Sequence, residues 1–136
     1  MTRVCLDSNV LVAAFVARGL CLDLLRLVGA EHDLIVPAVV AEEVRRVLSV
    51  QLRLSGPALE VAEEVLAECD IVPSTNAPCP VSVRDPDDER VLAEAIAAGA
   101  EILVSGDQDL LLVAETSPSR ILSPGAFMIL ARKSAT

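Results

Sequence analysis

The hydrophobic positions of the chain alternate between short continuous apolar runs and longer stretches of helical periodicity. The continuous runs predict strands at residues 3–7, 34–36, 71–73, 101–105 and 120–123. Between them, apolar residues recur at every third or fourth position, which predicts helices at residues 10–17 and 21–28, from Pro37 to about Leu48, from Gly56 to about Cys69, from Pro86 to near Gly99, and, as a short terminal helix, after residue 123. Residues 74–83 are rich in proline and predict a loop.

Continuous apolar strands that alternate with helices are typical of a mostly parallel sheet with both faces covered. We therefore expect an α/β fold of three layers, α/β/α, in a single domain over residues 1–136, a length that suits one core. In such folds functional groups gather beyond the carboxyl ends of the strands. Acids follow two of the predicted strands there, Asp7 after the first and Asp107 after the fourth. These two carboxylates are the first indication of a site.

Residues 84–91, RDPDDERV, place four acids at the start of a predicted helix. The helix dipole favours acids at this end, and Asp85 is well placed as the N-cap. On a helical wheel, however, Asp88 lies on the apolar stripe and points inward, whereas Glu89 and Arg90 lie away from it. An inward carboxylate needs a cation or several hydrogen bonds, although a capping box is an alternative explanation for Asp88.

The helix after Pro37 shows a similar pattern. Glu43 borders its apolar stripe and can reach inward, whereas Glu42 lies on the far side and is expected to face solvent. With Asp7, Asp88 and Asp107, this glutamate can converge on one pocket. Hard oxygen ligands of this kind suit Mg²⁺ or Mn²⁺, which assist reactions at phosphodiesters. The single histidine, His32, lies in a polar stretch before a strand, and we expect it to be a surface turn residue.

Composition limits the class of protein. Apolar residues make up 53% of the chain, too many for disorder, yet no apolar run reaches the roughly 18 to 20 residues that span a bilayer. Asp7 precedes the first apolar stretch, where an export signal would carry positive charge, so we expect a soluble, cytoplasmic protein with no membrane contact. The four cysteines show no C-x-x-C spacing, which favours small buried thiols over disulfides or a zinc site.

Four segments of the chain carry distinctive motifs. They are LDSNVLVAAF at residues 6–15, VVAEEVRRVL at 39–48, RDPDDERVLAEAIAAGAEILVSGDQDLL at 84–111 and ILSPGAF at 121–127. In this order and at these spacings they resemble the successive motifs of the PIN-domain family. The similarity is greatest to the branch of toxin components of toxin–antitoxin systems, related to VapC-like ribonucleases. It implies the three-layer α/β/α fold and a metal-dependent endoribonuclease with an antitoxin protein as a candidate partner.

By position, the resemblance assigns four acids to catalysis and to the binding of Mg²⁺ or Mn²⁺: Asp7, Glu43, Asp88 and Asp107. Ser8 and Asn9 match the usual neighbours of the first acid, Asp109 matches an auxiliary acid, and Asp85 keeps its capping role. The implied reaction is in-line attack of water on an RNA phosphodiester, leaving a 5′-phosphate and a 3′-hydroxyl, with Glu43 binding metal through water or orienting the nucleophile. Ser105 is placed to bond a carboxylate or the scissile phosphate, although a bond to the backbone explains it equally well.

The negative charge of the chain disfavours RNA binding, although it does not affect the assignment of the catalytic acids. The chain carries a net charge of −9 and remains acidic when the candidate site residues are set aside. We therefore expect RNA binding to depend on the metal ions and on local arginines, namely Arg18, Arg45, Arg46 and Arg53. Because the chain has only two aromatic residues, Phe15 and Phe127, we also expect exposed apolar helix faces that a homodimer covers.

An alternative hypothesis keeps the fold without the reaction, as a PIN domain that serves as a non-catalytic RNA- or protein-binding module. The presence of all four acids favours the enzyme. Metal-dependent cleavage of RNA would discriminate between the two hypotheses.

Overall fold

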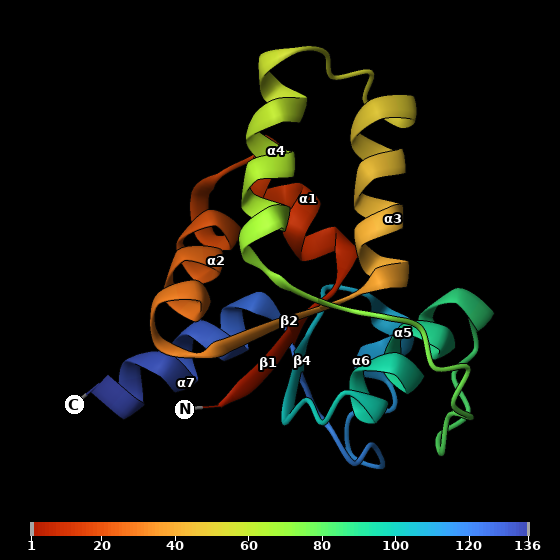
Figure 1. Cartoon of the computed structure of the whole chain (residues 1–136). Helices are drawn as coiled ribbons and strands as arrows, with labels where there is room; N and C mark the ends of the chain where they lie inside the picture. Colours follow the sequence, from red (N-terminus) through yellow and green to blue (C-terminus); the bar gives the residue numbers. More distant parts are fainter. Residues whose placement is uncertain (1, 136) are drawn as a thin grey trace.

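The structure, a computed structural model, describes residues 2–135 except the side chain of Ala135. Within them, one parallel sheet has the strand order β3-β2-β1-β4-β5 (Figure 1). The strands are β1 (Arg3–Leu6), β2 (Asp33–Pro37), β3 (Asp70–Val72), β4 (Ile102–Val104) and β5 (Arg120–Leu122). Each of them corresponds to a predicted strand, and the expectation of a mostly parallel sheet is confirmed.

Helices fill the connections between the strands. They are α1 (Ser8–Val16), α2 (Gly19–Glu31), α3 (Ala38–Arg46), the π-helix η1 (Val47–Gln51), α4 (Pro57–Glu68), α5 (Pro86–Ala97), α6 (Gln108–Leu111) and α7 (Pro124–Ala135). The short helix α6 was not predicted, because four residues are too few to show a hydrophobic period. Helices α1 and α2 begin earlier in the chain than the pattern indicates, and α3 continues through η1 past the predicted end at Leu48.

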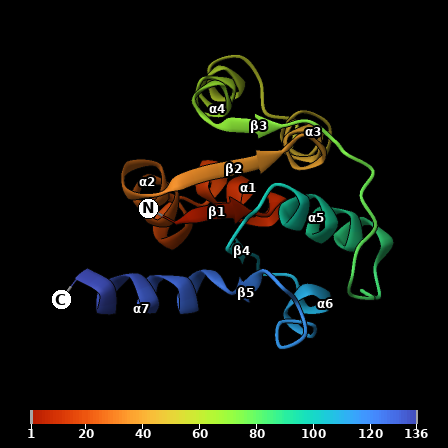
Figure 2. The same cartoon turned by 60° about the horizontal axis from the view of Figure 1, so that its bottom comes forward.

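The strand order fixes which helices share a layer. From β1 the chain moves outward through β2 to β3, then crosses back to β4 and continues to β5. Since such crossovers are right-handed, the reversal places α1 to α4 on one face and α5 and α6 on the other. Contacts agree, because α1 packs on α2 and α3 while α5 packs on α6. Figure 2 shows α3 and α4 beside β3, and α7 beside β5 at the opposite edge. The predicted three-layer α/β/α fold is confirmed.

The core lies on both sides of the central strand. Val4, Cys5 and Leu6 of β1 are all fully buried, as a strand covered on both faces requires. The four cysteines are free thiols, with Cys5 buried and the others half-buried, as the absence of C-x-x-C spacing indicates. Among the described residues, no helix is both long and apolar enough to cross a membrane.

His32 differs from its prediction. It follows the last residue of α2, in a turn as expected, but the ring is half-buried and packs edge-on against Phe127 of α7, with ring centroids 6.2 Å apart. The prediction that His32 lies at the surface was therefore wrong. The terminal helix α7 is three turns long, and its contact with α2 covers this ring, which the local sequence around His32 does not reveal.

The proline-rich loop after β3 is tied to α5 by side chains of that helix. Glu94, only 4% exposed, accepts hydrogen bonds from the backbone N–H and the hydroxyl of Thr75 and from the Arg90 guanidinium. Burial alone would raise the pKa of Glu94, but the bonds from Thr75 and the charge of Arg90 outweigh it and lower the pKa. Arg90 also donates to the carbonyl of Ala77 at 2.6 Å, and Glu89 accepts from the N–H of Val83 at 2.9 Å. The loop is thus held at three places.

Replacing Glu94 with Ala should therefore lower the free energy of unfolding by about 2–4 kcal/mol, because buried donors and the Arg90 charge lose their acceptor. Urea unfolding measures the change. Glu101→Ala, which removes an exposed carboxylate at the start of β4, is the matched control and should change stability by less than about 0.5 kcal/mol. Equal midpoints for the Glu94 variant and the wild type would show that the loop does not need this anchor.

Candidate functional site

The candidate site lies where the sheet reverses its winding. Strands β1 and β4 are neighbours, with Leu6 paired to Val104, and the chain leaves β1 toward α1 on one face and β4 toward α6 on the other. In open parallel sheets, ligands generally bind beyond the carboxyl ends of two strands that diverge in this way. Asp7 and Asp107 are the first acids beyond those ends.

Asp7 is the most deeply placed of these acids, with 2% of its surface exposed. It caps α1, and its Oδ1 accepts the N–H of Ser8 at 2.8 Å while its Oδ2 accepts the Ser105 hydroxyl at 2.7 Å. Burial raises the pKa of Asp7, the bonds from Ser105 and Ser8 partly oppose that rise, and the charges of Glu43 and Asp107 add to it. The carboxylate is held in a fixed orientation in surroundings that disfavour its negative charge.

Ser105 and Asn9 join the two segments that carry the acids. The Ser105 hydroxyl, besides donating to Asp7, accepts the N–H of Asp107 at 3.0 Å. The Asn9 amide donates to Asp7 Oδ2 at 3.1 Å, and its carbonyl oxygen accepts the N–H of Gly106 at 3.0 Å. Of the alternatives for Ser105, the hydroxyl thus bonds both a carboxylate and the backbone. Ser8 contributes its N–H to the same carboxylate.

Asp88 reaches this edge from the other layer. Because α5 precedes β4 and runs antiparallel to it, the first turn of α5 lies at the carboxyl ends of the strands. Burial, the charge of Asp107, a hydrogen bond shared with Asp107, and the charges of Asp85 and Asp7 together raise the pKa of Asp88 to about 7. Within the described residues, its Oδ2 atom is buried without a hydrogen-bond partner, and no capping-box bond joins Asp88 to the N–H of Asp85. This carboxylate does not cap its own helix.

Two further acids complete the cluster. One oxygen each from Asp85, Asp88 and Asp109 all lie within 4.8 Å of one another. Asp85 is the N-cap of α5, as expected, since its Oδ1 accepts the N–H of Asp87 at 2.8 Å. The predicted capping role of Asp85 is confirmed, and its carboxylate also lies beside those of Asp88 and Asp109. Asp107 in turn caps α6 by accepting the N–H of Asp109 at 2.8 Å.

The two glutamates of α3 differ as the wheel predicts. Glu43 is half-buried, and its charge acts on Asp7, whereas Glu42 is exposed. The predicted acids Asp7, Glu43, Asp88 and Asp107 are therefore electrostatic neighbours. The closest triple in the described structure, however, contains Asp85 and Asp109 instead of Asp7 and Asp107. Asp85 and Asp109 both belong to motifs noted in the sequence. The sequence did not show that their side chains point toward Asp88.

Sequence reasoning missed one basic residue at this cluster. The Nε atom of Arg84 lies 3.2 Å from Asp109 Oδ1, and the Arg84 side chain is 87% exposed. The only feature of the sequence that could have indicated Arg84 is its position directly before Asp85, at the start of an acidic stretch.

The donor set fits a hard divalent cation. It consists of carboxylate oxygens, one of them buried and unpartnered. Burial first, and then repulsion from neighbouring carboxylates, raises the pKa of both Asp7 and Asp88. A cation would remove that repulsion and satisfy the free oxygen. Oxygen-only ligands with room for water suit Mg²⁺ or Mn²⁺ better than Zn²⁺, which prefers nitrogen and sulfur.

A separate groove lies away from these acids. This groove of about 850 Å³ runs between α2 and α4 and is mainly apolar, with Phe15, Leu22, Leu25, Val61 and Val65 in its walls. None of the candidate acids at the strand ends lines this groove. Apolar grooves of this size accommodate apolar side chains or helices better than a phosphate.

Comparison with known proteins agrees with the fold and the motif order. The family model described as PIN domain matches residues 3–109. The chain belongs to the PIN domain family. No curated protein matches this PIN domain in sequence.

Two crystal structures resemble this PIN domain in fold. One is of VapBC2 from Rickettsia felis bound to a DNA fragment from their promoter, with a TM-score of 0.61 and 16% identity over 89% of this chain and 97% of that chain. The other is of PAE2754 from Pyrobaculum aerophilum, with a TM-score of 0.62 and 15% identity over 99% of this chain and 91% of that chain.

The raised pKa of Asp88 makes the stability of this PIN domain depend on pH. The pKa of Asp88 is about 7 in the folded protein and 3.8 for the unperturbed carboxyl. Between these values the folded state binds more protons, so in EDTA the free energy of unfolding should fall as pH rises from about 4 to 7 and then level off. Asp88→Asn removes this contribution and should be as stable as the wild type, or more stable, at pH 7.

Melting curves from pH 4 to 8 in EDTA test this expectation. The quantity to compare is the difference in melting temperature between the wild type and Asp88→Asn at each pH. Asp87→Asn is the matched control, since it makes the same change at the exposed neighbouring position. A lower melting temperature for Asp88→Asn than for Asp87→Asn at pH 7 would mean that Asp88 supports the helix and is not under repulsion.

Proposed function

We propose that the protein is a metal-dependent endoribonuclease that hydrolyses RNA phosphodiesters in the cytoplasm, as the toxin of a toxin–antitoxin pair. One observation carries the proposal. In a PIN domain, acids from both helical layers meet at the reversal of the sheet, and one of them, Asp88, presents a buried oxygen without a partner. Carboxylates that repel one another at neutral pH favour the binding of a cation between them, and that cation can in turn bind a phosphate.

The residues take distinct roles in this proposal. Asp7, Asp88 and Asp107 hold Mg²⁺ or Mn²⁺, and Glu43 binds through water or orients the attacking water. Ser105, Asn9 and the N–H of Ser8 fix the Asp7 carboxylate so that it does not rotate away. Asp109 and Asp85 extend the negative surface beside Asp88. When bound, the metal lowers the pKa of water and neutralises charge that develops on the phosphate.

A protein partner is part of the same proposal. One similar structure is a VapBC2 complex, and the present chain has an apolar groove between α2 and α4 that is separate from the acids. An antitoxin segment with an apolar helical face would bury Phe15, Leu22 and Val61 there. Occupation of this groove leaves the acids free, so inhibition would need a second part of the antitoxin at the strand ends.

Cleavage of RNA is the direct test of the reaction. A fluorescent single-stranded RNA should be cut in the presence of Mn²⁺ or Mg²⁺, leaving a 5′-phosphate, and EDTA should abolish the reaction. Asp7→Asn and Asp88→Asn should each reduce the rate at least about 100-fold, because each removes a charged ligand. Asp87→Asn should cleave like the wild type.

Wild-type protein that binds RNA without metal-dependent cleavage would favour the alternative, a PIN domain that acts as a binding module. Cleavage that Asp88→Asn retains at the wild-type rate would point to a contaminating nuclease or to a different site.

We also propose a homodimer. Several large apolar side chains near the ends of α1, α2 and η1 are exposed: Val16, Leu20, Val50 and Leu52. A second subunit that covers such a surface removes apolar area from water. Light scattering at micromolar concentration should therefore give the mass of two chains, and Val50→Asp should shift it toward one. A wild-type monomer at that concentration would remove the basis of the proposal.

A further inference from the structure

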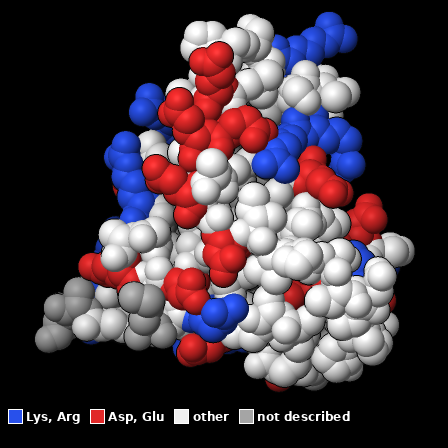
Figure 3. All heavy atoms as spheres, viewed as in Figure 1, with Lys and Arg blue, Asp and Glu red and all other residues white. Residues whose placement is uncertain are grey.

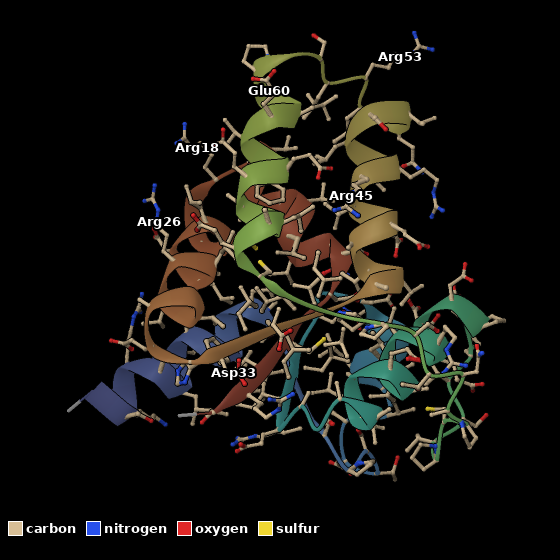
Figure 4. All side chains as sticks on the ribbon, in the orientation of Figure 1. Arg18, Arg26, Asp33, Arg45, Arg53 and Glu60 are labelled. Atoms are coloured by element: carbon tan, nitrogen blue, oxygen red, sulfur yellow. The ribbon has the colours of Figure 1, made fainter. Side chains whose placement is uncertain are left out.

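An acidic site must still attract a polyanion. The chain carries a net charge of −9, and Figure 3 shows acids gathered over α4, with basic side chains beside them over α3. Arg45 of α3 is paired with Glu63 of α4 at 2.8 Å, on the outside of this helix pair. In Figure 4, Arg18, Arg26 and Arg53 lie around α2 and at the tip of the α3–α4 hairpin, away from α5 and α6. Of the arginines expected to bind RNA, Arg18, Arg45 and Arg53 are therefore poorly placed for the reacting phosphate.

Arg84 is placed differently. Its Nε atom is 3.2 Å from Asp109, which belongs to the same carboxylate cluster as Asp85 and Asp88. Asp109 is only 15% exposed, whereas the Arg84 side chain is 87% exposed, so the guanidinium stands between the cluster and solvent. Because the guanidinium is exposed to solvent, this ion pair contributes little to stability, so stability does not explain the position of Arg84.

The backbone on both sides of Arg84 is fixed. The preceding residue, Val83, is buried and donates its N–H to Glu89 at 2.9 Å. The following residue, Asp85, caps α5 through the N–H of Asp87. The contact with Asp109 orients the Nε side of the guanidinium and leaves its two terminal nitrogens without a hydrogen bond in the described structure. Two parallel N–H donors match two oxygens of a phosphate.

We propose that Arg84 is a substrate-binding residue that holds an RNA phosphate beside the acidic cluster, with Asp109 as its positioning partner. This inference rests on the proposed ribonuclease function and adds a substrate contact to that site. The acids alone repel RNA, so one cation at their border makes the approach of the scissile region favourable. The free terminal nitrogens of Arg84 supply the contact, and the fixed backbone reduces the entropy lost on binding.

Steady-state cleavage of a single-stranded RNA in Mn²⁺ tests the inference with Arg84→Gln, Arg84→Lys and the control Arg53→Gln. Arg84→Gln should lower kcat/KM about 10- to 100-fold, mainly through KM, because a hydrogen-bonded charge contact is lost. Arg84→Lys should recover part of this loss, since it keeps the charge without the planar fork. Arg53→Gln removes the same charge at the far tip of the hairpin and should stay within about twofold of the wild type.

Salt dependence separates a phosphate contact from a structural role. For Arg84→Gln the slope of log kcat/KM against log salt should be shallower by about 0.7, the value for one phosphate contact on a single strand, and the melting temperature should not change. Equal kcat/KM and salt slopes for wild type and Arg84→Gln, beside active cleavage, would overturn this inference alone. A wild type without metal-dependent cleavage would overturn the proposed function and this inference with it.

Discussion

The hydrogen bond from the Ser105 hydroxyl to the Asp7 carboxylate, 2.7 Å long, is the contact on which the carboxyl edge of the sheet depends. It joins the ends of two neighbouring strands at the point where their helices diverge to opposite faces. The same hydroxyl accepts the N–H of Asp107 and so sets where α6 begins. Together with the two hydrogen bonds of Asn9, this link holds the first acids after β1 and β4 in place against their mutual repulsion. The sheet thus brings the two acids together, and the side chains of Ser105 and Asn9 orient them.

Two partly or fully buried acids of α5 illustrate opposite solutions to the cost of burial. Glu94 is surrounded by donors, and its pKa is lowered, so it remains charged and anchors a loop. Asp88, six residues earlier, faces other carboxylates, and its pKa is raised to about 7. Both residues lie on the same helix. The loop-anchoring acid therefore differs from the candidate site acid in the charge of its neighbours, which the degree of burial alone does not reveal.

Much of this arrangement could be predicted from the sequence, because it follows from local periodicity. Apolar runs located each strand of the sheet, and helical wheels oriented Asp88 inward and separated Glu43 from Glu42. The parts that escaped prediction depend on contacts between distant segments. The pairing of Arg84 with Asp109 joins a loop to α6, and the burial of His32 depends on the unexpectedly long α7. Glu94 carried no sign of its loop contacts, since a glutamate on a helix face is usually solvated.

The anchoring of the loop after β3 has a consequence for how the family can diverge in length. The loop is attached to α5 at Thr75, Ala77 and Val83, and each attachment is made by a side chain of the helix itself. Loop and helix therefore form one mechanical unit. Extra residues inserted between positions 78 and 82 would bulge into solvent between two attachments, at a closure cost that rises only slowly with length. Under the proposed function, such an insertion would add surface for contacts with RNA while the acids at the start of α5 keep their places.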